Sequence, residues 1–130
     1  MTAYIGAIDQ GTTGTRFMIF TRDGRVVSSA YREHRQIYPQ PGWVEHEPEE
    51  IWRATLAATS QVLTSYDASE LRAVGITNQR ETVALWDRET LTSPRKAIVW
   101  QDRRTADICT RLRDAGHEAR VTEVTGLRLD

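Results

Sequence analysis

The sequence has one cysteine, almost no lysine and no long apolar run. Cys109 stands alone among 130 residues, so the chain has no intrachain disulfide and no cysteine-based metal spacing. No stretch approaches the roughly 18 apolar residues of a membrane-spanning helix, and no secretory leader is recognisable. We therefore expect a cytoplasmic protein without a membrane span.

An excess of charge of either sign is also missing. The 17 basic and 18 acidic residues are interleaved and give a formal net charge of −1. This pattern provides no basic face for nucleic acid or for an anionic membrane. All basic residues except Lys96 are arginine, and we attribute this bias to the base composition of the genome rather than to function. His34, His46 and His117 are isolated from one another and from Cys109 in the sequence, so we assign them structural or solvent roles.

Four consecutive hydrogen-bonding side chains, Asn78-Gln79-Arg80-Glu81, directly follow an apolar run. A chain leaving a buried strand usually turns with Gly, Pro, Asn or Asp, whereas this one carries a guanidinium beside a carboxylate. Arg80 can donate to hydroxyl oxygens, and Glu81 can accept from hydroxyl hydrogens. The set suits a polyhydroxylated ligand. The alternative is a solvated loop with an incidental ion pair.

A second polar segment, residues 11–16, separates two short apolar runs and predicts a hairpin. Its glycines leave backbone N–H groups open to an anion, and its threonines add hydroxyl donors, as in a phosphate cradle. Asp9 could hold the waters of a magnesium ion, and Arg16 could meet a phosphate. A plain hairpin with threonine chosen for β propensity is the alternative. The P-loop pattern and the glycine-rich loop of protein kinases are both missing, which argues against a nucleotide kinase on either scaffold.

A third motif, residues 97–105, runs from an apolar strand through Trp100 into polar residues. An indole face packs against the C–H surface of a polyol while polar side chains bind its hydroxyls. Trp86 ends another apolar run and is a second candidate for this role. Burial in the core is the alternative for both tryptophans.

The pattern of elements predicts an α/β domain. Apolar runs at 4–8, 16–20 and 26–31 predict an antiparallel three-stranded meander. A helix is expected to begin near Pro48, with four residues facing the sheet: Ile51, Thr55, Ala58 and Val62. The remaining predicted elements are a strand at 71–77, an added hairpin at 83–86 and 97–100, and a helix at about 105–115. This order is the start of a ribonuclease-H-like layout.

Five runs in order and at similar spacing resemble the amino-terminal portion of the FGGY carbohydrate kinase family, in particular its members that phosphorylate glycerol. These runs are IDQGTTGTR, GWVEHEP, GITNQRETV, AIVWQDRRT and TGLRLD, and together they cover 4–130. The resemblance implies a ribonuclease-H-like, actin-like ATPase fold of two domains with the active site between them. It also implies ATP-dependent phosphorylation of glycerol to sn-glycerol 3-phosphate, with Mg²⁺.

The resemblance further implies individual roles. Residues Thr12, Thr13, Gly14 and Arg16 would meet the ATP phosphates, Asp9 would hold Mg²⁺ through water, and the glycerol site would consist of Arg80, Glu81 and Trp100. The family's loop usually reads Thr-Thr-Ser-Ser-Arg, so Gly14 replaces a serine hydroxyl by a backbone N–H. We expect serine at this position to be destabilising if Gly14 has positive φ and tolerated if it does not.

Residues 1–130 are interpreted as the amino-terminal part of the first kinase domain, with the rest of that domain and the second domain absent. The resemblance places the catalytic base in a later Gly-Asp-Gln segment, so we expect this piece alone to be inactive and to expose apolar surface on its sheet and over 105–130. The complete protein is expected to form a homo-oligomer. Two alternatives stay open: another FGGY sugar kinase, and a non-catalytic actin-like nucleotide-binding module.

Overall fold

Three consecutive strands form the antiparallel meander of the computed structural model, which describes residues 3–130. They are β1 (Tyr4–Gln10), β2 (Gly14–Phe20) and β3 (Val26–Glu33). In the β1–β2 register Asp9 lies opposite Arg16, and in the β2–β3 register Arg16 lies opposite Tyr31. These three side chains therefore share one face of the sheet, because directly paired residues point the same way. The predicted meander is confirmed.

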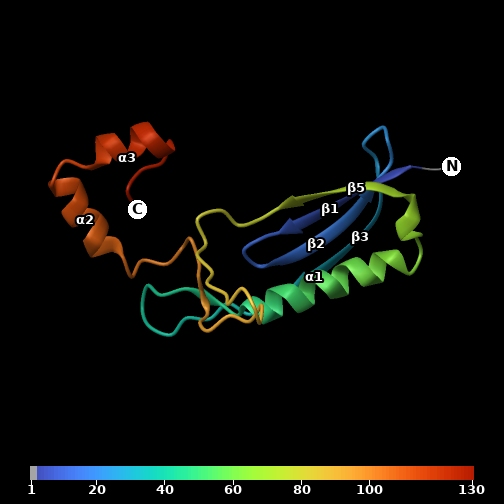
Figure 1. Cartoon of the computed structure of the whole chain (residues 1–130), viewed down its shortest axis with the longest axis horizontal. Helices are drawn as coiled ribbons and strands as arrows, with labels where there is room; N and C mark the ends of the chain where they lie inside the picture. The colour runs from blue at the N-terminus through green and yellow to red at the C-terminus, as the bar shows by residue number, and fades with distance from the viewer. Residues whose placement is uncertain (1–2) are drawn as a thin grey trace.

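A fourth strand, β5 (Leu71–Thr77), lies parallel to β1 and gives the sheet order β3-β2-β1-β5. The crossover between the meander and β5 contains helix α1 (Pro48–Leu63) and the short 3₁₀-helix η1 (Ala68–Glu70). Pro48 at the start of α1 and the carboxylates of Glu49 and Glu50 in its first turn suit a helix N-terminus. Helix α1 packs along one face of the sheet (Figure 1).

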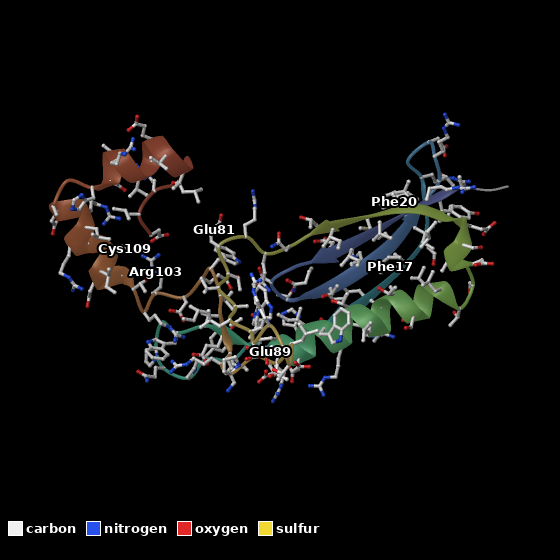
Figure 2. The ribbon with its side chains drawn as sticks, viewed as in Figure 1. Phe17, Phe20, Glu81, Glu89, Arg103 and Cys109 are labelled. Atoms are coloured by element: carbon white, nitrogen blue, oxygen red, sulfur yellow. The ribbon has the colours of Figure 1, made fainter. Side chains whose placement is uncertain are left out.

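The core lies between β2 and α1. Thr15, Phe17 and Ile19 alternate along β2 and are at most 1% exposed, which places them on the face toward the helix. Figure 2 shows Phe17 between the sheet and α1. The buried residues of the helix are Ala54, Ala58 and Val62. The buried face of α1 therefore differs slightly from the predicted one: Ala54 is buried, while Ile51 and Thr55 are only half-buried.

A second, two-stranded sheet pairs β4 (Glu45–His46) with β6 (Ala97–Ile98). The predicted hairpin of 83–86 with 97–100 is wrong, because only Val83 meets Ile98, in a single bridge. Two features account for this difference. Asp87 captures the backbone N–H groups of Glu89 and Thr90 in a local turn, and the strand at 97–98 pairs with the distant β4.

Two helices, α2 (Ala106–Asp114) and α3 (Glu118–Thr125), follow the second sheet and lie apart from the first one (Figure 1). Helix α2 was predicted. Helix α3 was not, and it ends at Gly126, which has a φ of 77°. Neither helix contains a buried residue. Within residues 3–130, no helix combines the length and the apolar character needed to cross a bilayer.

Apolar side chains are exposed on the sheet and on the final helices, as expected from the sequence. Val74 and Ile76 of β5 are 47% and 73% exposed, because α1 covers β2 and β3 but hardly reaches β1. The exposed apolar residues of the final segment are Ile108, Leu112, Val124 and Leu127.

Candidate functional site

A cavity of about 320 Å³ lies where the parallel strands β1 and β5 end side by side. Ligands commonly bind at the carboxyl ends of neighbouring parallel strands, because the polar residues that follow both strands meet there. Nine residues line the cavity: Asp9, Gln10, Gly11, Thr12, Asn78, Gln79, Arg80, Glu81 and Trp100. The structure thus brings together five of the predicted site residues from three separate motifs.

The loop after β5 presents Arg80 and Glu81 to this cavity. Both side chains are exposed, and neither forms an ion pair with any residue in 3–130. Figure 2 shows Glu81 on the connection between the main sheet and the α2–α3 segment. Its backbone has a φ of 63°, a strained conformation for a residue with a side chain. The pair is therefore available to a ligand rather than used in an internal salt bridge.

Trp100 joins the loop after β5 to the hairpin between β1 and β2. Its indole Nε1 donates to Thr12 Oγ1 at 2.9 Å, and its backbone N–H donates to Thr82 Oγ1 at 3.2 Å. The indole remains 53% exposed at the cavity. Since Thr12 Oγ1 accepts from the indole, its own hydroxyl proton is left to donate to a ligand.

The hairpin turn is tight and its threonines are held in place. Gly11 N–H donates to the carbonyl oxygen of Gly14 at 2.9 Å, so the turn itself spans only 11–14. Thr13 Oγ1 lies 3.1 Å from the Tyr31 hydroxyl on β3. Thr13 is exposed but, unlike Thr12, it does not line the cavity. Backbone and side-chain donors of this turn can therefore approach an anion from the cavity side and from the outer side.

Arg16 lies in strand β2, and Gly14 is both the last residue of the turn and the first residue of β2. Arg16 is exposed, and its guanidinium carbon lies 5.4 Å from the centroid of the Tyr31 ring. Gly14 is buried under the same ring, and its φ is not positive. A Cβ atom at Gly14 would stand 2.4 Å from the carbonyl oxygen of Arg32. Gly14 is thus a site of close packing between β2 and β3.

A buried polar network beneath the cavity was not predicted. His46 is fully buried, and Gln79 is 9% exposed. His46 Nε2 lies 2.8 Å from Gln36 Oε1, and His46 Nδ1 lies 3.2 Å from Gln79 Nε2. Gln79 was expected to contact ligand, but its amide nitrogen is hydrogen-bonded to Gln10 and His46. The sequence pattern around Glu45 and His46 does not indicate these contacts, because His46 is 10 positions from Gln36 and 33 positions from Gln79.

The prediction that the histidines are isolated is wrong for two of them. The rings of His34 and His46 meet edge to face, with centroids 4.5 Å apart. Neither ring nitrogen of His34 has a hydrogen-bond partner within residues 3–130, although both are buried. Burial lowers the pKa of His34, and burial together with the neighbouring His34 lowers the pKa of His46 to about 4. Both rings are therefore neutral at physiological pH.

We expect the stability of the chain to fall in mild acid because of this pair. Below a pH of about 6.5 these histidines bind protons in the unfolded state but stay neutral in the folded state. The free energy of unfolding therefore decreases progressively as the pH falls from 6.5 toward 4. A pKa lowered from 6.5 to about 4 corresponds to about 3 kcal/mol at most. Urea unfolding at pH 7.5 and 5.0 measures the loss, and His46→Gln should reduce it. An equal loss in that variant would contradict the assignment.

Trp86 does not lie at the cavity, so its proposed role beside the polar cluster is wrong. It is 63% exposed, which also excludes the alternative of core burial. With Leu85 and Leu91 it borders Trp52 on α1, in a separate surface hollow. The failed hairpin explains this placement, because 84–86 leave the second sheet after the single bridge at Val83.

Asp102 and Arg104 fix the segment that carries Trp100. Asp102 accepts the backbone N–H of Val44 at 2.7 Å, and its carboxylate binds the Arg104 guanidinium at 2.8 Å. Arg104 also pairs with Glu45 and lies 3.7 Å above the Trp43 ring. The Arg104 guanidinium and two backbone N–H groups outweigh burial and lower the pKa of Asp102. These residues hold the wall of the site without facing a ligand.

The described residues 3–130 contain no group of three or more His, Cys, Asp or Glu side chains that could hold a metal ion. Asp9 is an exposed carboxylate at the cavity, and no hydrogen bond or ion pair within this range occupies it. A free carboxylate of this kind could hold Mg²⁺, which keeps several of its waters and needs only one or two protein carboxylates.

Comparison with known proteins agrees with these features. Residues 4–130 match the model of the N-terminal domain of the FGGY family of carbohydrate kinases. Glycerol kinases from Burkholderia vietnamiensis and Haloferax volcanii are 55% and 56% identical over 129 residues, which is 98% of this chain. The crystal structure of Plasmodium falciparum glycerol kinase with ADP superposes with a TM-score of 0.87 at 30% identity, over 99% of this chain and 26% of that one. The chain spans about a quarter of the length of these relatives: 26% of the Burkholderia vietnamiensis protein and 25% of the Haloferax volcanii protein.

Proposed function

This chain belongs to the FGGY family of carbohydrate kinases, and from that premise we propose that it supplies the polyol site and the phosphate hairpin of an ATP-dependent glycerol kinase. The observation that carries the proposal is the shared cavity. Arg80, Glu81 and Trp100 line it together with Thr12. A polyol and the terminal phosphate of a nucleotide would meet there.

The proposed reaction transfers the γ-phosphoryl group of ATP to a terminal hydroxyl of glycerol and yields sn-glycerol 3-phosphate. Arg80 would donate to glycerol oxygens while Glu81 accepts hydroxyl hydrogens, and the Trp100 face would cover the carbon chain. Such a clamp accelerates phosphoryl transfer by orienting the attacking oxygen. We assign the general base to the part of the full-length relatives that this chain does not cover.

On the nucleotide side, we propose that Thr12, Thr13 and the turn backbone bind the phosphates. Arg16 and Asp9 are cross-strand neighbours on the open face of the sheet, with no ion pair between them. Arg16 would neutralise phosphate charge, and Asp9 would hold water molecules of Mg²⁺, which neutralises charge on the β- and γ-phosphates when bound. At Gly14 only the backbone N–H would donate to a phosphate oxygen, because glycine lacks the hydroxyl of the usual serine.

We further propose a cytoplasmic homo-oligomer in which the rest of the full-length protein covers the exposed faces of β5, α2 and α3. Val74 and Ile76 on an unpaired sheet edge support this view, since such an edge pairs readily with another strand. Sedimentation of the full-length protein measures the oligomer.

A chimera tests the proposed function. In it, this chain replaces the matching quarter of the Burkholderia vietnamiensis relative. We expect it to release ADP from ATP with glycerol and to make sn-glycerol 3-phosphate, with the unaltered relative as control. Propane-1,2-diol should be a poor substrate, because the groups built for the missing hydroxyl stay unpaired. A folded chimera that prefers a longer sugar, or that binds ATP without turnover, contradicts the proposal.

Thr12→Val should weaken the nucleotide step without unfolding the chain. Valine keeps the shape but removes the proton that would donate to phosphate and the oxygen that accepts from Trp100. We expect kcat/KM for ATP in the chimera to fall by about 5- to 10-fold, as for one lost hydrogen bond. Thr110→Val, on the distant helix α2, is the matched control. Unchanged ATP kinetics in the Thr12 variant would show that the turn has a purely structural role.

A further inference from the structure

We propose that His46 is a positioning residue that couples the loop after β5 (residues 78–82, the polyol loop) to the turn between β1 and β2 (residues 11–14, the phosphate hairpin). The inference rests on the proposed function, but it concerns three residues that the function itself does not use: Gln36, His46 and Gln79. None of them needs to touch either substrate. They join the two halves of the site from beneath, through hydrogen bonds between side chains.

The connection can be followed atom by atom. Gln36 Nε2 donates to the carbonyl oxygen of Thr12 at 2.8 Å, so one end of the chain of contacts is the hairpin itself. Gln36 Oε1 lies 2.8 Å from His46 Nε2. His46 Nδ1 lies 3.2 Å from Gln79 Nε2, and Gln79 immediately precedes Arg80. Three side chains therefore bridge the hairpin and the polyol loop.

Only one arrangement of protons satisfies every contact. Because the Gln36 amide nitrogen faces the Thr12 carbonyl, its oxygen faces His46, and His46 Nε2 must carry the proton. His46 Nδ1 is then an acceptor, which suits the Gln79 amide. That amide has two protons and two acceptors, Gln10 Oε1 at 3.2 Å and His46 Nδ1. The orientation of each side chain is thus fixed by its neighbours.

The contacts close into a ring. Thr82 Oγ1 donates to Gln79 Oε1 at 3.0 Å and accepts from the backbone N–H of Trp100. The Trp100 indole then donates to Thr12 Oγ1. Starting from the carbonyl of Thr12, the ring returns to the hydroxyl of the same residue. Two of its members, His46 and Gln79, are at most 9% exposed, so water cannot easily replace their bonds.

This geometry gives the ring a function that simple packing would not have. Arg80 and Glu81 follow Gln79 directly, and Thr12 lines the same cavity from the turn between β1 and β2. Fixing Gln79 against Thr12 therefore fixes the distance between the polyol ligands and the phosphate ligands. Phosphoryl transfer depends on that distance, because the attacking oxygen and the phosphorus must be held in line.

Two substitutions at His46 separate the two links. His46→Asn places an oxygen near the former Nδ1, which still accepts from Gln79 but no longer reaches Gln36. His46→Gln places an amide nitrogen near the former Nε2, which still donates to Gln36 but loses the acceptor for Gln79. In the chimera we expect His46→Gln to raise KM for glycerol, and His46→Asn to raise KM for ATP, each by about 5- to 10-fold. The other KM in each variant should stay within about twofold.

His34→Phe is the matched control. The His34 ring packs against His46, and its nitrogens have no hydrogen-bond partner of good geometry within residues 3–130, although the Thr12 backbone lies near enough to oppose the lowering of its pKa. Phenylalanine keeps the edge-to-face packing, so both KM values should equal those of the parent. Circular dichroism and thermal unfolding show whether each variant is folded. Folded Asn and Gln variants with the same kinetics as each other would overturn the proposal, since a structural role alone predicts no opposite split.

Nitrogen NMR of His46 tests the ring without reference to activity. In the parent we expect the neutral tautomer with the proton on Nε2 and an unprotonated Nδ1 at pH 7. In Gln79→Leu the Nδ1 signal should shift as its donor is lost. The Nδ1–H tautomer in the parent would overturn the inference even in an active enzyme. Loss of glycerol turnover in the parent chimera, with the expected tautomer present, would contradict the proposed function instead.

Discussion

Replacing Gly14 with serine is expected to lower the free energy of unfolding by about 3 kcal/mol. A Cβ atom there would stand 2.4 Å from the Arg32 carbonyl oxygen and 2.6 Å from the Tyr31 ring. The carbonyl belongs to strand β3 and cannot move without disturbing the sheet. The sequence-based expectation that a non-positive φ would make serine tolerable is therefore wrong, because the obstacle is the neighbouring strand.

Urea unfolding measures this change, and Gly75→Ser is the matched control. Gly75 also lies in a strand of the main sheet, its φ is not positive, and a Cβ there would meet nothing within 4 Å. That variant should stay within about 0.5 kcal/mol of the parent. Adding Tyr31→Ala to Gly14→Ser should restore only part of the stability, since the Arg32 carbonyl remains. Equal stability of the two serine variants would contradict the packing argument.

Replacing Arg80 with alanine is expected to lower kcat/KM for glycerol in the chimera by about 30- to 150-fold. This corresponds to about 2–3 kcal/mol for the lost charged hydrogen bonds to glycerol oxygens. Arg80 has no ion-pair partner in the described part of the chain, so its removal should leave stability nearly unchanged. Steady-state kinetics with glycerol and with ATP measure the effect, which should be confined to glycerol.

Two further variants define this prediction. Arg80→Lys keeps the charge but loses the planar fork, so it should recover only part of the activity. Arg88→Ala removes an exposed arginine from the turn at 87–94 and should behave as the parent. If Arg80→Ala phosphorylates glycerol normally, Arg80 has no place in the polyol site.

The main sheet and α1 could be predicted from the sequence because their apolar patterns are local. Alternation in β2 and helical spacing in α1 report which side of each element is buried. The pairing of the strand at 97–98 was not predicted, because its partner is β4. Strand β4 lies some 50 residues earlier in the chain and is only two residues long. Helix α3 was missed because half of its eight residues are β-branched and therefore have low helix propensity: Val121, Thr122, Val124 and Thr125.

The sequence indicated which polar and aromatic side chains would gather at one place where they come in runs beside apolar segments. The structure places Arg80, Glu81 and Trp100 at the same cavity, and their binding roles remain a prediction. The ring through His46 was not predictable, because each of its contacts depends on the orientation of a side-chain amide or imidazole contributed by a different segment. Histidine and glutamine in such positions look like ordinary polar residues until the fold brings them together.

The backbone of Glu81 has a consequence for protein engineering. A non-glycine residue at a φ of 63° costs about 1 kcal/mol, so Glu81→Gly should be selected in a screen for thermal stability. The same substitution removes the carboxylate from the cavity. Leu91, at a φ of 58° on an exposed turn, offers the same gain outside the cavity. At position 81, a screen for heat resistance should therefore favour glycine, whereas a screen for turnover should reject it. At position 91, both screens should accept glycine.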